Sequence, residues 1–156
     1  MKLVTIGAYG FTPRTFVRAL RDHDIDTFVD LRRRRGVRGS QYAFLNHRRL
    51  EALLAKQRIR YIYIPELAPP SDLLALQLRT DRANGESPRT RTRLAPAYIA
   101  GFKRDVLAHF GRRDFAARLG DTRVVALFCV ETEPACCHRS LVARAMATGR
   151  VIDVTP

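Results

Sequence analysis

The segment 123–130, with the sequence RVVALFCV, is the most apolar stretch of the chain and decides how the chain folds. It shows no alternation of polar and apolar residues, which is typical of a strand that other elements cover on both faces. Shorter strand-like segments occupy residues 2–6, 26–31, 61–64 and 151–154. This pattern indicates a mainly parallel sheet in which 123–130 is a central strand.

Helical patterns separate these strands. Thr12 and Pro13 form a good helix start, because a hydroxyl residue can cap the first turn and proline fits the first helical position. Further helical patterns lie at 48–57, 98–110, 115–119 and 140–148. Strands that alternate with helices are the signature of parallel βαβ units. The sequence therefore predicts an α/β fold, with one three-layer domain over residues 1–156.

The regular pattern weakens between Pro69 and Pro96. A group of leucines at 73–78 allows a short helix, and Asn84-Gly85 then breaks the pattern. Arginines alternate with threonines after that point, at Arg89, Arg91 and Arg93. We expect 69–96 to be a mobile basic insertion over the strand ends. The alternative is a solvated surface loop without a role.

The charge of the chain predicts a polyanionic partner. The formal net charge is +13, and arginine supplies nearly all of the positive charge. Because arginine binds phosphate bidentately and stacks on bases, we expect nucleic acid, DNA rather than RNA, or another polyanion. A biased genome composition would explain the preference for arginine over lysine, but not the shortage of acidic residues.

The sequence also indicates a compartment. No apolar run approaches the ~20 residues that a membrane-spanning helix needs, and we expect no signal peptide. The three cysteines, Cys129, Cys136 and Cys137, are too few and too clustered for a disulfide framework. Reduced thiols in the cytoplasm fit best. Nothing in the sequence indicates an oligomeric state.

Four strand ends carry glycine turns or ionisable groups. In an open parallel sheet, ligands bind outside the carboxyl ends of the strands. These ends read Gly7-Ala8-Tyr9-Gly10, Asp30-Leu31-Arg32, Pro65-Glu66 and Cys129-Val130-Glu131. We expect them to meet around one cavity. Gly7 and Gly10 do not form the GxGxxG fingerprint, so we predict no nicotinamide cofactor, and a tight turn alone would also explain them.

The segment 129–139, CVETEPACCHR, allows three interpretations. Cys129 or Cys137 could be a nucleophile with His138 as its base. Cys129, Cys137 and His138 could hold a metal, although adjacent ligands are unusual and the common zinc spacing is absent. Alternatively, Cys129 is a small buried side chain, and His138 and Arg139 only anchor the following helix. The sequence assigns neither a metal nor a cofactor.

The densest positive charge follows the predicted strand 26–31. It consists of Arg32, Arg33, Arg34, Arg35 and Arg38, with Arg48 and Arg49 further on and Tyr42 and Phe44 between them. Such a loop can follow a phosphate backbone while its aromatic rings stack on bases, and Arg89, Arg91 and Arg93 could add to it. The alternative is a solvated charged face. Asp30 is placed to orient Arg32.

The ordered motifs resemble the domain-of-unknown-function 488 family. The matching residues run over almost the whole chain: Thr5-Ile6-Gly7, Gly10, Phe16, Asp30-Leu31-Arg32, Phe44, Asn46, Tyr61, Pro65-Glu66-Leu67, Tyr98, Phe102, Cys129-x-Glu131, Pro134 and Cys137-His138-Arg139. The block from Cys129 to Arg139 is the most specific of them. The resemblance implies an α/β fold and a shared site at the strand ends, but no activity.

We therefore predict a nucleic-acid-binding enzyme that acts on a DNA base or sugar-phosphate, in the manner of a glycosylase or hydrolase. The alternatives are a cysteine enzyme on a small anionic substrate and a non-catalytic nucleic-acid-binding module. Catalytic candidates are Glu131, Glu66, Cys129 and His138. Candidates for substrate binding are Gly7, Tyr9, Gly10, Asp30, Arg32, Tyr42, Cys137 and Arg139.

Overall fold

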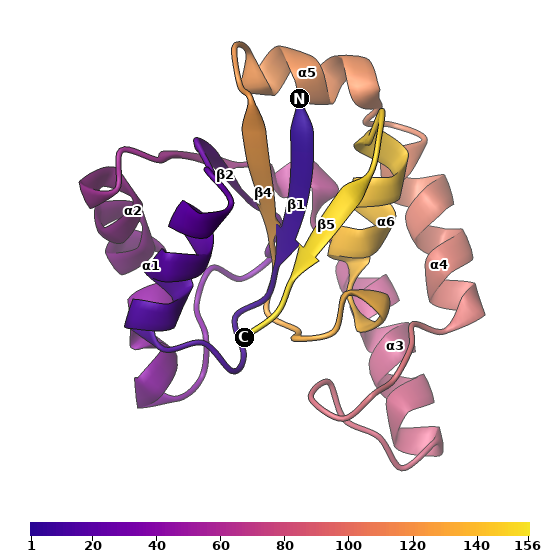
Figure 1. The fold of residues 1–156 in the computed structure, drawn as a ribbon. Coiled ribbons are helices and arrows are strands. Elements are labelled where there is room, and N and C mark those ends of the chain that lie inside the picture. Colours follow the sequence, from indigo (N-terminus) through magenta and orange to yellow (C-terminus); the bar gives the residue numbers. More distant parts are fainter.

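The computed structural model describes residues 1–156 as a five-stranded sheet with helices on both faces (Figure 1). The strands are β1 (Lys2–Ile6), β2 (Thr27–Asp30), β3 (Arg60–Tyr63), β4 (Val124–Phe128) and β5 (Val151–Val154). All neighbouring strands are parallel, in the order β3-β2-β4-β1-β5. The predicted α/β fold is confirmed, and β4 is the central strand.

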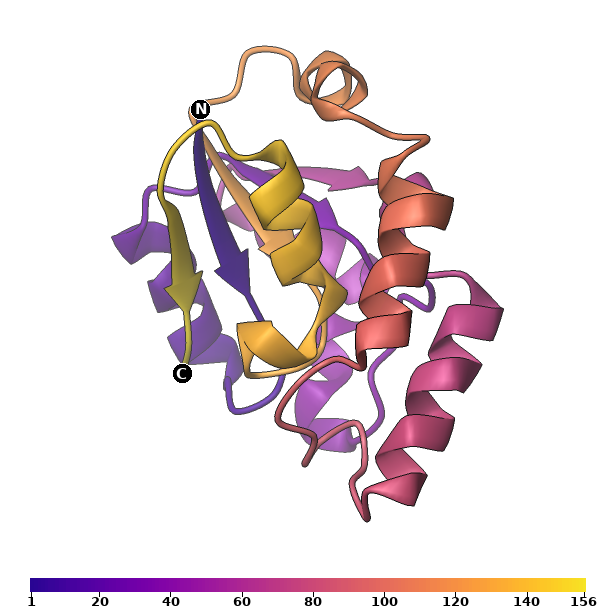
Figure 2. The same cartoon turned by 90° about the vertical axis from the view of Figure 1, so that its right-hand side faces the viewer.

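Helices form the two outer layers (Figure 1, Figure 2). One face carries α1 (Pro13–Asp22) and α2 (His47–Lys56), and the other carries α3 (Ser71–Ala83), α4 (Pro96–Phe102) and α6 (His138–Met146). A π-helical turn, Lys103–Leu107, continues α4, and α5 (Arg112–Leu119) lies near the amino ends of the strands. Short 3-10 helices occupy Ser40–Leu45, Pro65–Leu67 and Pro134–Cys136. None of the helices has the length and apolar content to cross a membrane.

Each face of the sheet has its own hydrophobic layer, because successive side chains of a strand point to opposite faces. On β4, Phe128 packs against Phe16 of α1, while Leu127 belongs to the layer that includes Phe102 of α4. All four side chains are completely buried. Since truncating a buried phenylalanine to alanine costs about 3–5 kcal/mol, these layers hold the strand ends in fixed positions.

The connections that follow β1 and β4 leave the sheet on opposite faces. After β1 the chain enters α1, and after the neighbouring β4 it enters α6 (Figure 1). This divergence between adjacent parallel strands opens a crevice of the kind in which ligands bind. A Cβ atom on Gly7 would overlap the carbonyl oxygen of Glu131. Glycine at position 7 therefore lets the two strand-end loops approach each other.

The segment 69–96 has more regular structure than its sequence predicts. In α3, which is 13 residues long, the buried side chains of Leu73, Gln77 and Asp81 recur every four residues. Two of these three are polar, so the helical period is weak in a hydrophobicity pattern. Residues 84–95, which we call the strap, then pass beside the loops that follow β1 and β4. The mobility of this segment stays a prediction.

Candidate functional site

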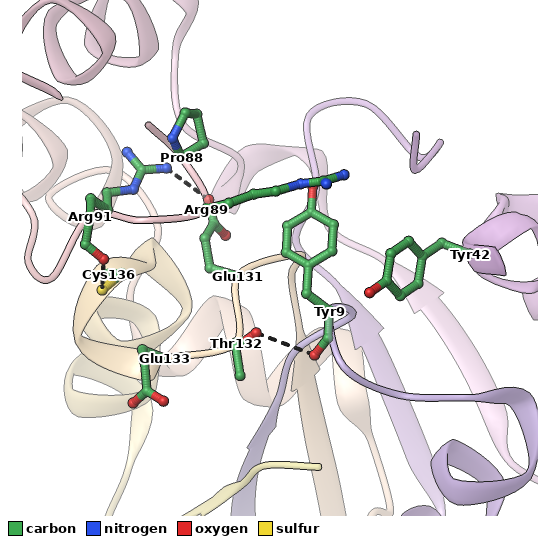
Figure 3. Close-up of a pocket in the computed structure, with 9 residues that line it drawn as sticks. All are labelled: Tyr9, Tyr42, Pro88, Arg89, Arg91, Glu131, Thr132, Glu133 and Cys136. Atoms are coloured by element: carbon green, nitrogen blue, oxygen red, sulfur yellow. Dashed lines mark hydrogen bonds and ion pairs between the residues drawn. The ribbon is translucent and has the colours of Figure 1, made fainter. Parts of the chain in front are cut away.

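A cavity of about 540 Å³ lies at the carboxyl ends of the central strands. Its volume is within the range of about 300–1,000 Å³ that is usual for small-molecule sites. The residues that line it include Tyr9, Arg33, Arg34, Arg38, Arg91, Tyr98, Cys129, Glu131 and His138. A smaller cavity of about 140 Å³ shares Tyr9, Arg91 and Glu131 with it (Figure 3). The loops after β1, β2 and β4 thus meet at one place, whereas Pro65-Glu66 after β3, the fourth strand end that the sequence predicts there, does not join them.

Glu131 lies where the two cavities meet, and it is the one acidic residue that lines the larger cavity. Its carboxylate accepts a hydrogen bond from Nη2 of Arg91 at 3.0 Å, and Sγ of Cys129 donates to it at 3.4 Å. The side chain is 13 % exposed. Burial, together with the nearby Cys137, raises the pKa of Glu131 to about 7. The structure therefore supports Glu131 as the acidic group of a site.

Arg139 holds the loop that carries Glu131. Its guanidinium donates to the carbonyl oxygens of Glu131 and Thr132, the latter at 2.7 Å, and its Nε donates to the hydroxyl of Thr5 at 3.3 Å. The side chain is completely buried and lines neither cavity. The predicted contact between Arg139 and a substrate anion is therefore not supported, because its donors are used to fix the loop against β1.

Asp30 and Arg32 form a buried ion pair. The guanidinium donates to both carboxylate oxygens, at 2.9 and 2.7 Å, and to the carbonyl oxygen of Leu45 at 2.9 Å. Tyr61 donates a further hydrogen bond to Asp30 at 2.7 Å. Arg32 and Asp30 are 2 % and 0 % exposed. The sequence predicts substrate contacts for both residues. Arg32 does line the larger cavity, whereas Asp30 lines neither cavity, and the polar atoms of the pair connect β2, β3 and the turn at 40–45.

Two of the three cysteines join His138 in a buried cluster. Sγ of Cys129 and Sγ of Cys137 each lie 3.8 Å from Nδ1 of His138, and the three atoms lie within 4.8 Å of one another. Hydrogen bonding to Cys137 and burial raise the pKa of Cys129 well above its usual value. Cys136 stays outside the cluster and donates to the carbonyl oxygen of Arg91 at 2.9 Å. The cluster is the part of the site that could hold a metal.

Aromatic side chains form one wall of the smaller cavity (Figure 3). The rings of Tyr9 and Tyr42 meet edge to face at 5.3 Å, and the guanidinium of Arg89 lies 4.7 Å from the centre of the Tyr9 ring. The phenol oxygen of Tyr42 accepts the N–H of Gly10 at 3.1 Å. Gly10 and Gly7 line neither cavity, so both act in the loop structure and not in the predicted substrate binding.

The arginines predicted to bind nucleic acid fall into three groups. Three are exposed and line the larger cavity, namely Arg33, Arg34 and Arg38. Two belong to the strap and line the smaller cavity, namely Arg89 and Arg91. The others line neither cavity: Arg35 packs 4.3 Å from the ring centre of Tyr63, and three more are exposed elsewhere, namely Arg48, Arg49 and Arg93.

Glu66 does not share a site with Glu131. It follows β3, the edge strand, and its carboxylate pairs with Arg118 of α5. It lines neither cavity, so its predicted catalytic role has no support. Conversely, the larger cavity includes Gln77, for which no role is predicted. Its position in the sequence could have indicated this, because Gln77 comes four residues after Leu73 and therefore lies on the same buried side of the helix.

A family model described as "Domain of unknown function DUF488" matches residues 12–146. The matched range runs from Thr12, the cap of α1, to the end of α6, and so includes the strap and the cysteine–histidine cluster. No curated protein and no solved structure was found to match the chain.

Proposed function

The chain belongs to the DUF488 family, and from the geometry of its site we propose that it is a nucleic-acid-binding enzyme. In this proposal, exposed arginines hold the phosphodiester backbone, and a base or sugar-phosphate unit enters the larger cavity. Glu131 acts on that unit as a general acid or base. The reaction would be of the glycosylase or hydrolase kind.

The observation that carries the proposal is that a cationic rim and a single carboxyl group share one cavity. Arg33, Arg34 and Arg38 line the same cavity as Glu131. Guanidinium groups bind phosphate oxygens in a bidentate manner, and a nearby carboxyl group can transfer a proton. The net charge of +13 would also attract a polyanion over a long distance.

The position of Tyr9 favours a nucleotide as the group that enters the cavity. Its ring lines both cavities and lies under the guanidinium of Arg89. Bases stack on aromatic rings, and a base inside a duplex must first leave its stack to reach such a ring. We therefore expect single-stranded or flipped-out nucleotides to be the substrates.

The cysteine-nucleophile alternative is less well supported. Cys137 is only 1 % exposed and lines neither cavity, and Cys129, which lines the larger cavity, has a pKa that hydrogen bonding to Cys137 and burial raise well above its usual value. A nucleophile needs access to its substrate. The other alternative, a non-catalytic binding module, differs from our proposal in one respect. Only an enzyme of the proposed kind needs the carboxyl group of Glu131 for product formation.

The test is to incubate the full-length protein with single-stranded and duplex oligonucleotides that carry damaged, mismatched or normal bases. We expect base release or strand cleavage on at least one of them. Glu131→Gln should lower the rate by about 100-fold or more, the usual contribution of general acid–base catalysis, without weakening binding. Glu66→Gln is the matched control, because Glu66 is exposed and lines neither cavity. Binding without any product would support the binding module instead.

A further inference from the structure

The cluster of Cys129, Cys137 and His138 has no part in the proton transfer described above, and we propose that it is a zinc site. Zinc is bound by cysteine sulfur at about 2.3 Å and by histidine nitrogen at about 2.0–2.1 Å. In a tetrahedral site these bond lengths place neighbouring ligand atoms about 3.5–3.8 Å apart. Both Sγ–Nδ1 distances in the cluster are 3.8 Å. The two sulfur atoms lie within 4.8 Å of each other, so an approach of at most about 1 Å would let the three donors share one ion.

The orientation of His138 fits a metal ligand. Its Nε2 donates to the carbonyl oxygen of Leu31 at 3.0 Å, so Nδ1, the ring nitrogen that faces the two sulfur atoms, is the one available to a metal. Histidines that bind metals usually donate their second ring nitrogen to a carbonyl or carboxylate in this way, because the bond fixes both the tautomer and the ring orientation.

The backbone explains how two adjacent residues can both be ligands. Cys137 is the N-cap of α6 and has an extended conformation, with φ −133° and ψ 141°. His138 is the first residue of the helix. The change from extended to helical backbone between these two positions lets both side chains approach Cys129 at the end of β4. Sequence spacing alone could not indicate this arrangement.

Charge balance also favours a divalent cation at this position. The three side chains are buried. Zinc binding releases the thiol protons, and two thiolates with one Zn²⁺ ion form a unit with no net charge, so the bound site would bury no unpaired charge. Softer thiolate and imidazole donors select zinc over magnesium or calcium, which prefer oxygen ligands.

The cluster faces the larger cavity on one side, since Cys129, His138 and Glu131 all line it. Three protein ligands with an open position toward a cavity are typical of catalytic zinc sites, whereas structural sites have four protein ligands. A zinc ion held there would polarise an oxygen atom of a bound substrate or water. This inference goes beyond the proposed function, because metal binding can be measured without any nucleic acid.

The test begins with full-length protein that has been stripped with a chelator and then equilibrated with zinc alone. We expect one zinc ion per chain by elemental analysis, and Cys137→Ser and His138→Ala should each weaken binding by about 100-fold or more. Cys136→Ser is the matched control, because Cys136 is also buried but lies outside the cluster. Failure of the wild type to retain zinc, or equal loss in the control, would overturn the proposal.

A second measurement uses only the wild-type protein, so it tests the zinc site even if a variant fails to fold. Cobalt(II) added to the stripped wild-type protein should give the visible absorption of a tetrahedral site and a thiolate-to-cobalt charge-transfer band. A spectrum of octahedral cobalt without the charge-transfer band would contradict the zinc site.

Discussion

Arg32 and Arg33 are neighbours in the sequence, yet they lie in two regions with opposite surroundings. Arg32, like Arg139, is buried at the strand ends, where its guanidinium binds groups of the protein itself. Arg33 is exposed and lines the cavity together with Arg34 and Arg38. We call the first pair the buried arginines and these three the rim arginines. Arg32 also lines this cavity, so the two groups differ in what their guanidinium groups contact: the protein itself for the buried arginines, and the open side of the cavity for the rim arginines.

The largest expected effect concerns the partner of a buried arginine. Asp30→Ala would leave the guanidinium of Arg32 charged, buried and without its carboxylate. We expect a loss of about 3–5 kcal/mol in the free energy of unfolding, measured by urea denaturation. Asp22→Ala, at an exposed position of α1, should change it by less than about 0.5 kcal/mol. Similar losses in the two variants would contradict the structural role of the pair.

A somewhat smaller effect is expected at the other buried arginine. Arg139→Ala would remove the hydrogen bonds to Thr5, Glu131 and Thr132 and leave space in the core. The expected loss of unfolding free energy is about 2–4 kcal/mol. Arg144→Ala is the control, because Arg144 lies exposed on the same helix. If Arg139→Ala kept full stability and lost only ligand binding, Arg139 would belong with the rim arginines.

The strap also contains one arginine that is bound by groups of the protein and one that is exposed. Arg91 bridges Asp81 at 3.2 Å and Glu131 at 3.0 Å and is only 8 % exposed, whereas Arg89 is exposed over Tyr9. Arg91→Ala should lower the free energy of unfolding by about 1–3 kcal/mol, because it leaves two carboxylates without their cationic partner. Arg89→Ala should lower it by about 0.5–1 kcal/mol, because only the contact with the Tyr9 ring is lost. Hydrogen exchange over residues 84–95 should accelerate in the first variant only. Equal exchange in both variants would refute the anchoring role of Arg91.

The fold could be predicted from the sequence because its signals are local. Unbroken apolar strands, the Thr12 cap and alternating helices identify an α/β fold, and the strand-end rule places Cys129 and Glu131 at the crevice. The burial of Arg32 and the exposure of Arg33 could not be predicted in the same way. It depends on the contacts of Arg32 with Leu45 and Phe128, which tertiary packing creates. The edge position of β3, which removes Glu66 from the site, likewise follows from strand order.

The central claim is that the cavity at the end of β4 binds nucleic acid through its rim arginines, and the salt dependence of binding tests it most directly. Binding is measured by fluorescence anisotropy with a single-stranded oligonucleotide at several salt concentrations. In the variant Arg33→Ala/Arg34→Ala/Arg38→Ala, the magnitude of the slope of log K against log salt concentration should fall by about 2. Three exposed arginines that do not line the cavity provide the control of equal charge, namely Arg113, Arg144 and Arg150 changed to alanine. We predict an almost unchanged slope for that control. The same decrease in both triple variants would contradict the claim, because binding would then depend on total charge and not on the cavity.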